Sequence, residues 1–188
     1  MNDICVLYDS LAGLLKYPDA DFFERLAECR TLLADQAEAS ALLERFIGEI
    51  HGSSTEDLEE LFTQTFDLDP ICSLEVGWHL YGENYSRGEF LVKMRQALRE
   101  HGVEETTELP DHLTHVLAVL CRLEPRQADR FTMDHVLPAL GKMLAGLRGK
   151  ASPYEHLLET IRSVLLSPSG AVVCAREPLG AAGLEEEP

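Results

Sequence analysis

The sequence predicts a single all-α domain, a helical bundle of about eight to ten helices. Apolar residues recur along almost the whole chain at the three- and four-residue spacing of one helix face. Glycine, proline and capping residues separate these periodic segments at short intervals. No β-hairpin signal competes with them, and 188 residues, 45% of them hydrophobic, suit one domain with a sizeable buried core.

The first two helices are expected between residues 4 and 33. Residues 4–15 carry apolar side chains on one face. The Tyr-Pro dipeptide at 17–18 ends this helix, because the residue before a proline avoids the helical region. Asp19 or Asp21 then caps a second helix, which has its apolar positions within 22–33.

Two further helices are expected between residues 42 and 66. The apolar positions of the third lie within 42–50, and His51-Gly52 ends it. The run at 53–56, Ser-Ser-Thr-Glu, is typical of a capping box and starts a fourth helix that extends to Phe66. The stretch 67–70, Asp-Leu-Asp-Pro, breaks that helix.

The middle of the chain predicts a short helix followed by a long one. The short helix covers 74–81, and the chain turns at 82–84. Ser86 is expected to cap a helix that runs to Leu98 and is closed by the His-Gly pair at 101–102.

The remaining helices follow a polar loop at 103–110. Asp111 is expected to cap a helix over 113–123. Pro125 starts another helical stretch that runs to Gly149, with a kink expected near Pro138.

The last helix opens at Ser152 or Pro153 and carries apolar positions to Leu165. These elements define one helical domain over residues 1–167. Residues 168–188 are expected to form a flexible acidic C-terminal tail, because they combine prolines and glycines with three terminal glutamates.

The charge of the chain excludes some classes of partner. The formal net charge is −17, from 33 acidic and 16 basic residues. Nucleic-acid binding and attraction to anionic membranes both require clustered Lys and Arg, so neither is predicted. From Asp19 to Asp69 there are 14 acidic and 3 basic residues. This excess favours a basic peptide partner, or forms a solvated surface that keeps the protein soluble.

The cysteines and the N-terminus predict a cytoplasmic protein. The number of cysteines is odd and none are spaced as C-x-x-C, which is typical of reduced thiols in the cytosol. No secretory signal and no apolar run of about 20 residues is visible, so no membrane span is expected. The five cysteines are Cys5, Cys29, Cys72, Cys121 and Cys174.

Signatures of catalysis are largely missing. The chain has no phosphate-binding loop, no G-x-S-x-G and no H-E-x-x-H. His112 and His115 are three residues apart on one predicted helix and could face a metal ion, which keeps a helical metal-dependent hydrolase as an alternative. Zinc sites usually need four ligands, and Cys121 is about two turns away from His115. No cofactor is therefore predicted, and a packed histidine pair is the simpler interpretation.

The segment 108–112, Glu-Leu-Pro-Asp-His, differs from an ordinary loop. Pro110 fixes the approach of the chain and Asp111 is suited to cap the following helix. A helix start explains these two residues and leaves Glu108 and His112 unexplained.

Three segments together resemble the NarJ-like members of the TorD/DmsD superfamily of redox enzyme maturation chaperones. Residues 7–19 are similar to the opening helix of that family with its Tyr-Pro turn. Residues 65–68 and 72–74, followed by Gly82 and Arg87-Gly88, carry the second similarity. Residues 108–113 are similar to the E-x-P-D-H signature of the superfamily.

This resemblance implies a TorD/DmsD-like helical fold and a cytoplasmic chaperone without enzymatic activity. Such chaperones bind the N-terminal region, often a twin-arginine leader or its remnant, of the apo catalytic subunit of a molybdenum oxidoreductase. They support molybdenum cofactor insertion before membrane docking or export, here in nitrate assimilation or for a related chlorate, selenate, ethylbenzene or dimethyl sulfide enzyme. Members of the family occur as monomers and as domain-swapped dimers.

A helical bundle can bind an amphipathic peptide helix in an apolar groove, and acidic residues beside the groove would favour an arginine-bearing leader. Packing is expected to bring the second and third segments together. Glu108, Asp111 and His112 are expected to lie at the rim of the groove. The predicted peptide-binding residues are Phe66, Asp67, Leu74, Trp78, Tyr81, Glu108, Pro110, Asp111 and His112. A generic acidic adaptor that binds other proteins through its charged face remains a second alternative.

Overall fold

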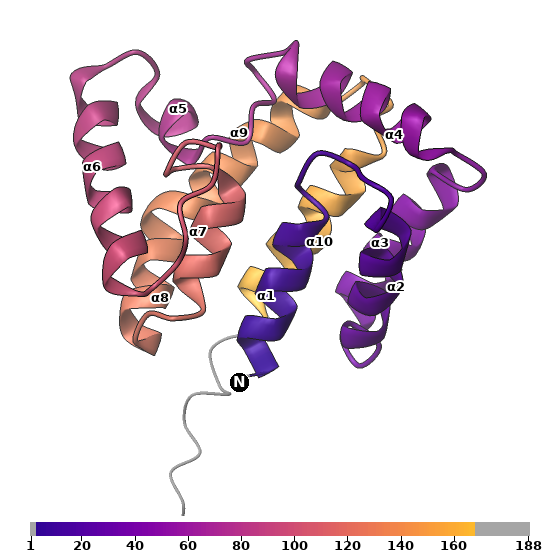
Figure 1. The fold of residues 1–188 in the computed structure, drawn as a ribbon, viewed down its shortest axis with the longest axis horizontal. Coiled ribbons are helices and arrows are strands. Elements are labelled where there is room, and N and C mark those ends of the chain that lie inside the picture. Colours follow the sequence, from indigo (N-terminus) through magenta and orange to yellow (C-terminus); the bar gives the residue numbers. More distant parts are fainter. Residues whose placement is uncertain (1–2, 168–188) are drawn as a thin grey trace, which may run out of the picture.

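The computed structural model describes residues 3–167, and every regular element in this range is a helix (Figure 1). The predicted all-α, single-domain class is thereby confirmed. In chain order the elements are α1 (Asp3–Gly13), α2 (Phe22–Leu32), α3 (Ala37–Glu49), α4 (Thr55–Phe62), η1 (Thr63–Asp67), α5 (Val76–Tyr81), α6 (Tyr85–Glu100), α7 (Leu113–Leu120), α8 (Pro125–Phe131), η2 (Thr132–Val136), α9 (Leu137–Leu147) and α10 (Tyr154–Leu166).

The helices pack as two halves. The first half contains α1 to α4, η1 and α10, with α10 against α3 and α1 against α2. The second half contains α5 to α9 and η2, with α5 packed on both α6 and α9. The halves meet where α1 packs on α7 and where α10 packs on α9, as Figure 1 shows.

The chain crosses between the halves twice, through the connection after η1 and through the connection from α9 to α10. The two crossings lie side by side, because Lys150 of one forms an ion pair with Asp69 of the other. The buried hydroxyls of Thr65 and Ser152 also share a hydrogen bond of 3.1 Å between the same two regions. Both crossings lie at the upper end of the molecule in Figure 1.

Aromatic residues form the core of the first half. Phe66 packs edge-to-face on Tyr154, with 4.8 Å between the ring centroids, and on Phe62 at 5.0 Å. Phe46 contacts the same tyrosine at 5.6 Å. Tyr154 is fully buried, and burial raises the pKa of its hydroxyl far above the ordinary range. These ring contacts, two edge-to-face and one tilted, fix α3, η1 and α10 together.

Several helix ends differ from the sequence prediction. The first helix ends at Gly13, two residues earlier than expected. Asp21 occupies the position before α2 but makes no capping hydrogen bond with its side chain. Asn84, and not Ser86, caps α6, because the Asn84 side chain accepts a hydrogen bond of 3.1 Å from the Ser86 N–H. The amide oxygen of asparagine serves this role as well as a hydroxyl does.

Other predicted helix ends are confirmed. Ser54 caps α4 in a capping box that is completed by the Asp57 carboxylate. Gly52 and Gly102, with φ angles of 86° and 64°, close two helices in the left-handed conformation that glycine tolerates. Pro125 occupies the first turn of α8. Near the kink expected at Pro138 the helix contains the π-helical turn η2, which ends two residues before Pro138, a residue that has no N–H to donate.

No helix within residues 3–167 is long and apolar enough to cross a membrane. The acidic tail predicted for residues 168–188 lies outside the described residues, as does Cys174.

Candidate functional site

The second and third motif segments lie against each other as two extended strands of backbone. Glu75 and His112 form an isolated antiparallel bridge. On either side of it, the Val76 N–H donates to the Asp111 carbonyl and the Leu113 N–H donates to the Leu74 carbonyl, both at 2.9 Å. The expectation that packing unites the two segments is therefore confirmed.

Asp111 caps a helix, but not the predicted one. Its side chain is fully buried, and its Oδ2 accepts a hydrogen bond of 2.9 Å from the Gly77 N–H in the first turn of α5. The Nε of Arg87 lies 3.8 Å from the same oxygen. Burial raises the pKa of the Asp111 carboxyl, while Arg87 and the Gly77 hydrogen bond oppose this effect. Asp111 thus fixes α5 and the start of α6 from a third segment of the chain.

Gly77 is required by this contact. A Cβ atom at position 77 would lie 2.6 Å from Asp111 Oδ2 and 2.9 Å from a ring carbon of Phe90. Only a residue without a side chain allows the carboxylate and α6 to approach α5 so closely. The sequence signal for this was a glycine next to Trp78 inside a predicted helix, and its significance was missed.

His112 takes the capping role that was predicted for Asp111. It is the N-cap of α7, where its Nδ1 accepts a hydrogen bond of 3.3 Å from the Thr114 N–H and lies 2.8 Å from the Thr114 hydroxyl. The residue is 6% exposed. Burial lowers the pKa of the imidazole to about 4, with the nearby Glu75 carboxylate acting in the opposite direction. His112 is therefore neutral at pH 7.

His115 fastens the loop that precedes α7. Its Nδ1 donates to the Leu109 carbonyl at 2.9 Å, and its Nε2 accepts from the Thr106 N–H at 3.2 Å. Both ring nitrogens are occupied, which leaves no lone pair for a metal ion in this conformation. Among residues 3–167, no three His, Cys, Asp or Glu side chains are grouped as metal ligands.

Trp78 and Tyr81 project from α5 toward the surface. The Trp78 Nε1–H donates to the Pro70 carbonyl at 2.8 Å, and the guanidinium of Arg87 lies over the indole, 5.3 Å from its centroid. Tyr81 packs on Phe90, with ring centroids 5.6 Å apart. Both side chains are half-buried, so each presents part of an aromatic ring to solvent.

Two pockets share Tyr81 as a common wall. One, of about 440 Å³, is lined mainly by apolar side chains of α6, α7 and α8, including Phe90, Met94, Val119 and Phe131. The other, of about 530 Å³, lies on the Trp78 side of α5. Together they form an apolar surface that continues across α5, which we call the α5–α8 surface.

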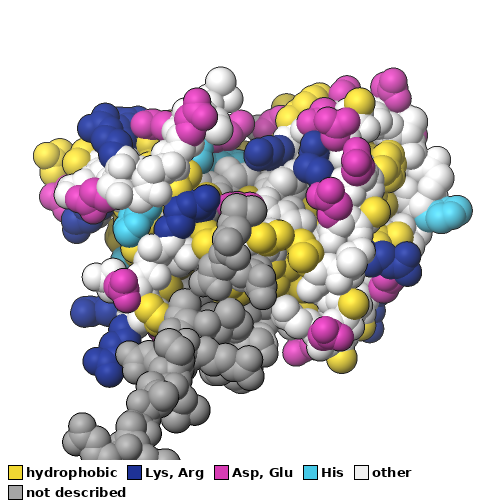
Figure 2. Space-filling model, turned by 60° about the horizontal axis from the view of Figure 1, so that its bottom comes forward, with side chains coloured by type: hydrophobic (Ala, Val, Ile, Leu, Met, Phe, Trp, Pro, Cys, Tyr) yellow, Lys and Arg dark blue, Asp and Glu magenta, His cyan; other side chains and the backbone are white. Residues whose placement is uncertain are grey.

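The acidic fringe expected around the groove is not found at this surface. Glu89 and Lys93, of opposite charge, are the acidic and basic residues that line the apolar pocket beside α6. The acidic excess of the chain lies over α2, α3 and α4 instead, and Figure 2 shows Lys and Arg side chains more often over α6 and α8 on the face in view. Most of the acidic excess therefore lies in the first half of the fold, whereas the α5–α8 surface lies in the second half.

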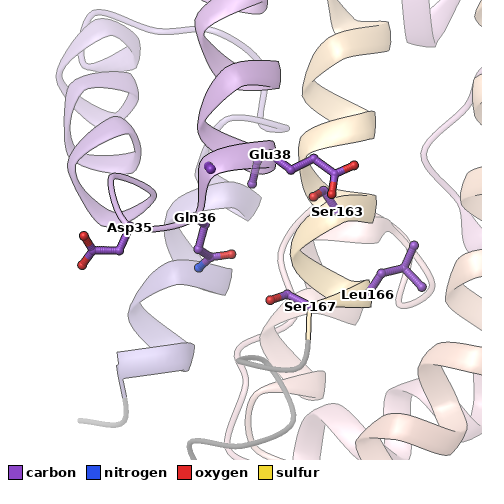
Figure 3. A pocket seen from close by; sticks show the side chains of 8 residues that line it. Asp35, Gln36, Glu38, Ser163, Leu166 and Ser167 are labelled. Atoms are coloured by element: carbon purple, nitrogen blue, oxygen red, sulfur yellow. The ribbon is translucent and has the colours of Figure 1, made fainter.

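A separate polar pocket, of about 310 Å³, lies where the start of α3 meets the end of α10 (Figure 3). Glu38 reaches toward Ser163 across it, and Asp35 and Gln36, which precede α3, and Leu166 of α10 also line it. None of the motif residues line this pocket, and its side chains carried no recognisable sequence signal.

The nine predicted peptide-binding residues therefore occupy different environments. Trp78 and Tyr81 line pockets, and Glu108 is exposed on the loop before α7. Leu74, Pro110, Asp111 and His112 are buried behind α5, so the expectation that the last two lie at a rim is wrong. Phe66 belongs to the aromatic core, and Asp67 is exposed at the end of η1. Arg87, Gly77 and Phe90 complete the cluster and were not predicted as site residues.

Comparison with known proteins places this geometry in a family. The chain is 28% identical over 159 residues to the nitrate reductase molybdenum cofactor assembly chaperone NarJ of Escherichia coli K12, a match to 80% of this chain and 66% of that protein. It is 25% identical over 167 residues to the probable NarJ chaperone of Bacillus subtilis, covering 87% and 90% of the two chains.

The nitrate reductase-like protein NarX of Mycobacterium tuberculosis is 25% identical over 158 residues, which are 83% of this chain and 24% of that protein. The chain thus spans just under two thirds of the E. coli relative and about a quarter of the mycobacterial one. The two NarJ relatives are named as assembly chaperones and not as enzymes, in agreement with the sequence prediction. A model of the nitrate reductase delta subunit family matches residues 30–156, more than half of the chain, and the chain belongs to that family.

Proposed function

We propose that this protein is a cytoplasmic chaperone that binds the N-terminal region of the apo catalytic subunit of a molybdenum oxidoreductase, most closely of the nitrate reductase type. Binding would support molybdenum cofactor insertion and hold the subunit back from membrane docking or export. Family membership and the names of the NarJ relatives support the chaperone role. The structural observation that carries the proposal is the α5–α8 surface, which is held in place by the paired motif segments.

The α5–α8 surface has the chemistry that an amphipathic peptide helix requires. A helix that docks in a groove contributes apolar side chains from positions i, i+3, i+4 and i+7. The apolar pocket beside α6 offers room for several such side chains, and Tyr81 divides it from the pocket beside Trp78. Glu89 at the edge supplies one carboxylate for an arginine of a leader.

The buried motif residues then act as positioning residues. Asp111 holds the first turn of α5 through Gly77, and His112 caps α7, so both α5 and α7 keep the orientation that forms the surface. Neither side chain needs to touch the client for this role. Their substitution is expected to weaken binding because Trp78 and Tyr81 shift.

A calorimetric titration with a peptide from the N-terminus of the host nitrate reductase catalytic subunit tests the proposal. About 15 residues give a helix of roughly four turns, enough to span the surface. Trp78 is the single tryptophan of the chain, so its fluorescence reports on the same site during the titration. Binding with a change in the Trp78 emission is the expected result.

Two tyrosine variants make the location testable. Tyr81→Ala removes an aromatic anchor from the α5–α8 surface and should weaken peptide binding about tenfold or more. Tyr85→Ala is the matched control, since Tyr85 lies on neighbouring α6, is 83% exposed and lines neither pocket. Equal affinities of both variants and the wild type, with unchanged melting temperatures, would refute the α5–α8 surface as the binding site.

The same titration and a pull-down separate the alternatives. An acidic adaptor would bind the basic peptide through α2 to α4, and would lose affinity steeply with added salt while ignoring Tyr81→Ala. A metal-dependent hydrolase would retain a stoichiometric ion after purification. Recovery of the apo catalytic subunit from the native host is what the chaperone function requires.

A further inference from the structure

We propose that Cys5 and Cys121 are a redox-sensitive pair that closes into a disulfide and joins the two halves of the fold. Cys5 lies in α1, and Cys121 directly follows α7. The Cys5 thiol donates a hydrogen bond of 3.0 Å to the Cys121 carbonyl, although 116 positions separate the two residues. The pair therefore sits on the α1–α7 contact, where the two halves meet.

Both thiols are partly accessible and lie close to each other. Cys5 and Cys121 are partly exposed, whereas Cys29 and Cys72 are fully buried. The Cys121 thiol also faces the Ala118 carbonyl at 3.4 Å. Closure requires rotation of the two side chains until the sulfur atoms meet, with the Cα atoms at the separation of about 4.4–6.8 Å that a disulfide spans.

Burial slows the reaction of the pair at neutral pH, because it disfavours the reactive thiolate form of Cys121. Burial, together with the adjacent Cys5 thiol, raises the pKa of Cys121 to about 12. Arg122 acts in the opposite direction: its Nη1 donates to Cys121 Sγ at 3.2 Å and its Nη2 lies 3.5 Å from Asp9 on α1. The thiol is thus protonated at neutral pH, and its oxidation is expected to accelerate as the pH rises.

Hydrogen peroxide supplies the two-electron oxidant. It oxidises one thiol to a sulfenic acid and releases one water. The second thiol attacks that sulfur, the S–S bond forms and a second water leaves. Two thiols and one peroxide molecule are converted to one disulfide and two water molecules.

The two halves are connected by the two chain crossings at one end of their interface. The disulfide would connect them at the opposite end. In Figure 1 the N-terminal end of α1 lies at the lower end of the molecule and the crossings lie at the upper end, where Lys150 pairs with Asp69. A closed loop of this length restricts the unfolded chain strongly, which corresponds to a rise in melting temperature of roughly 10 °C. In the oxidised form the two halves are therefore covalently cross-linked. Peptide binding itself does not require this cross-link.

The test uses the full chain treated with hydrogen peroxide at several pH values. Non-reducing digestion and mass spectrometry should identify a Cys5–Cys121 peptide, and the melting temperature should rise and return after reduction. Cys5→Ser and Cys121→Ser should lose both effects. Cys174→Ser is the matched control and should retain both.

Three results would overturn the proposal. A disulfide that contains Cys174 and disappears in Cys174→Ser identifies a different pair. Oxidation of Cys5 or Cys121 to sulfinic acid without a cross-link shows that the thiols do not meet. A cross-link that still forms in Cys5→Ser, with an unchanged melting curve, shows that the cysteine of α1 is not part of the disulfide.

Discussion

His112 makes the stability of the protein depend on pH in a way that one substitution isolates. The neutral imidazole caps α7 and is buried, and burial lowers its pKa from 6.5 to about 4. In the unfolded chain the same residue gains a proton below about pH 6.5. His112→Asn keeps a capping side chain, because asparagine is a favoured N-cap, and removes the titrating group.

The size of the effect follows from the two pKa values. One pKa unit corresponds to about 1.4 kcal/mol, so the full shift is worth about 3 kcal/mol of unfolding free energy. The unfolded state binds more protons between pH 6.5 and pH 4, so stability is lost as the pH falls through this window. Between pH 7 and pH 5 the wild type should lose about 2 kcal/mol more than His112→Asn.

Urea denaturation at pH 7, 6 and 5, followed by circular dichroism, measures the difference. The variant loses some packing, which lowers its unfolding free energy by the same amount at every pH. Comparing how the unfolding free energy of each protein changes with pH removes this constant difference. His79 and His135, whose pKa values are also lowered by burial, are present in both proteins and cancel. Parallel curves for the two proteins would refute a buried neutral His112. A steeper loss in the variant would reverse the sign of the effect.

Further predictions concern close backbone approaches and one helix cap, each measured by the urea midpoint. Gly77→Ala forces a methyl group against a buried carboxylate and should lower the free energy of unfolding by about 1–3 kcal/mol. Gly88→Ala, on α6, places its methyl group where no atom lies within 4 Å and should raise the free energy of unfolding by up to about 1 kcal/mol. An equal effect of both would contradict the close packing at α5. Gly146→Ala should destabilise by a similar 1–3 kcal/mol, roughly, because its Cβ would lie 2.8 Å from a backbone carbonyl oxygen, and Gly141→Ala on the same helix should not. Ser54→Ala should cost about 1 kcal/mol by removing the cap of α4, and an unchanged midpoint would show that the capping box is dispensable.

Elements set by local chemistry could be predicted from the sequence. Helix positions followed from apolar periodicity, and the ends at Gly52, Gly102 and Pro125 followed from backbone preferences of single residues. The Ser54 capping box is likewise a pattern within four residues. These features depend on neighbours along the chain, so one sequence contains enough information to place them.

Features set by contacts between distant segments could not be placed in this way. Asp111 looked like the cap of the helix that follows it, yet its carboxylate crosses to the first turn of α5, 34 residues earlier. The acidic excess between Asp19 and Asp69 was visible, but its position relative to the motif depends on how the two halves pack. Phe66 illustrates the same limit, because its apolar ring suited a groove as well as the core in which it is found.

One polar atom of each side chain in the Asp-His pair is used inside the protein, namely Oδ2 of Asp111 and Nδ1 of His112. Asp111 holds α5, His112 begins α7 and His115 fastens the loop between them, so each side chain stabilises a different piece of the same corner. A client that took Oδ2 of Asp111 would have to displace the Gly77 hydrogen bond and draw the carboxylate away from Arg87, which costs more than a typical contact gains. Under the proposed function, binding and support are divided between two layers, with the aromatic rings of α5 outside and the charged and capping groups behind them. Substitutions in the inner layer should lower peptide affinity in proportion to the loss of stability, whereas Tyr81→Ala should lower affinity by more than its loss of packing on Phe90 accounts for.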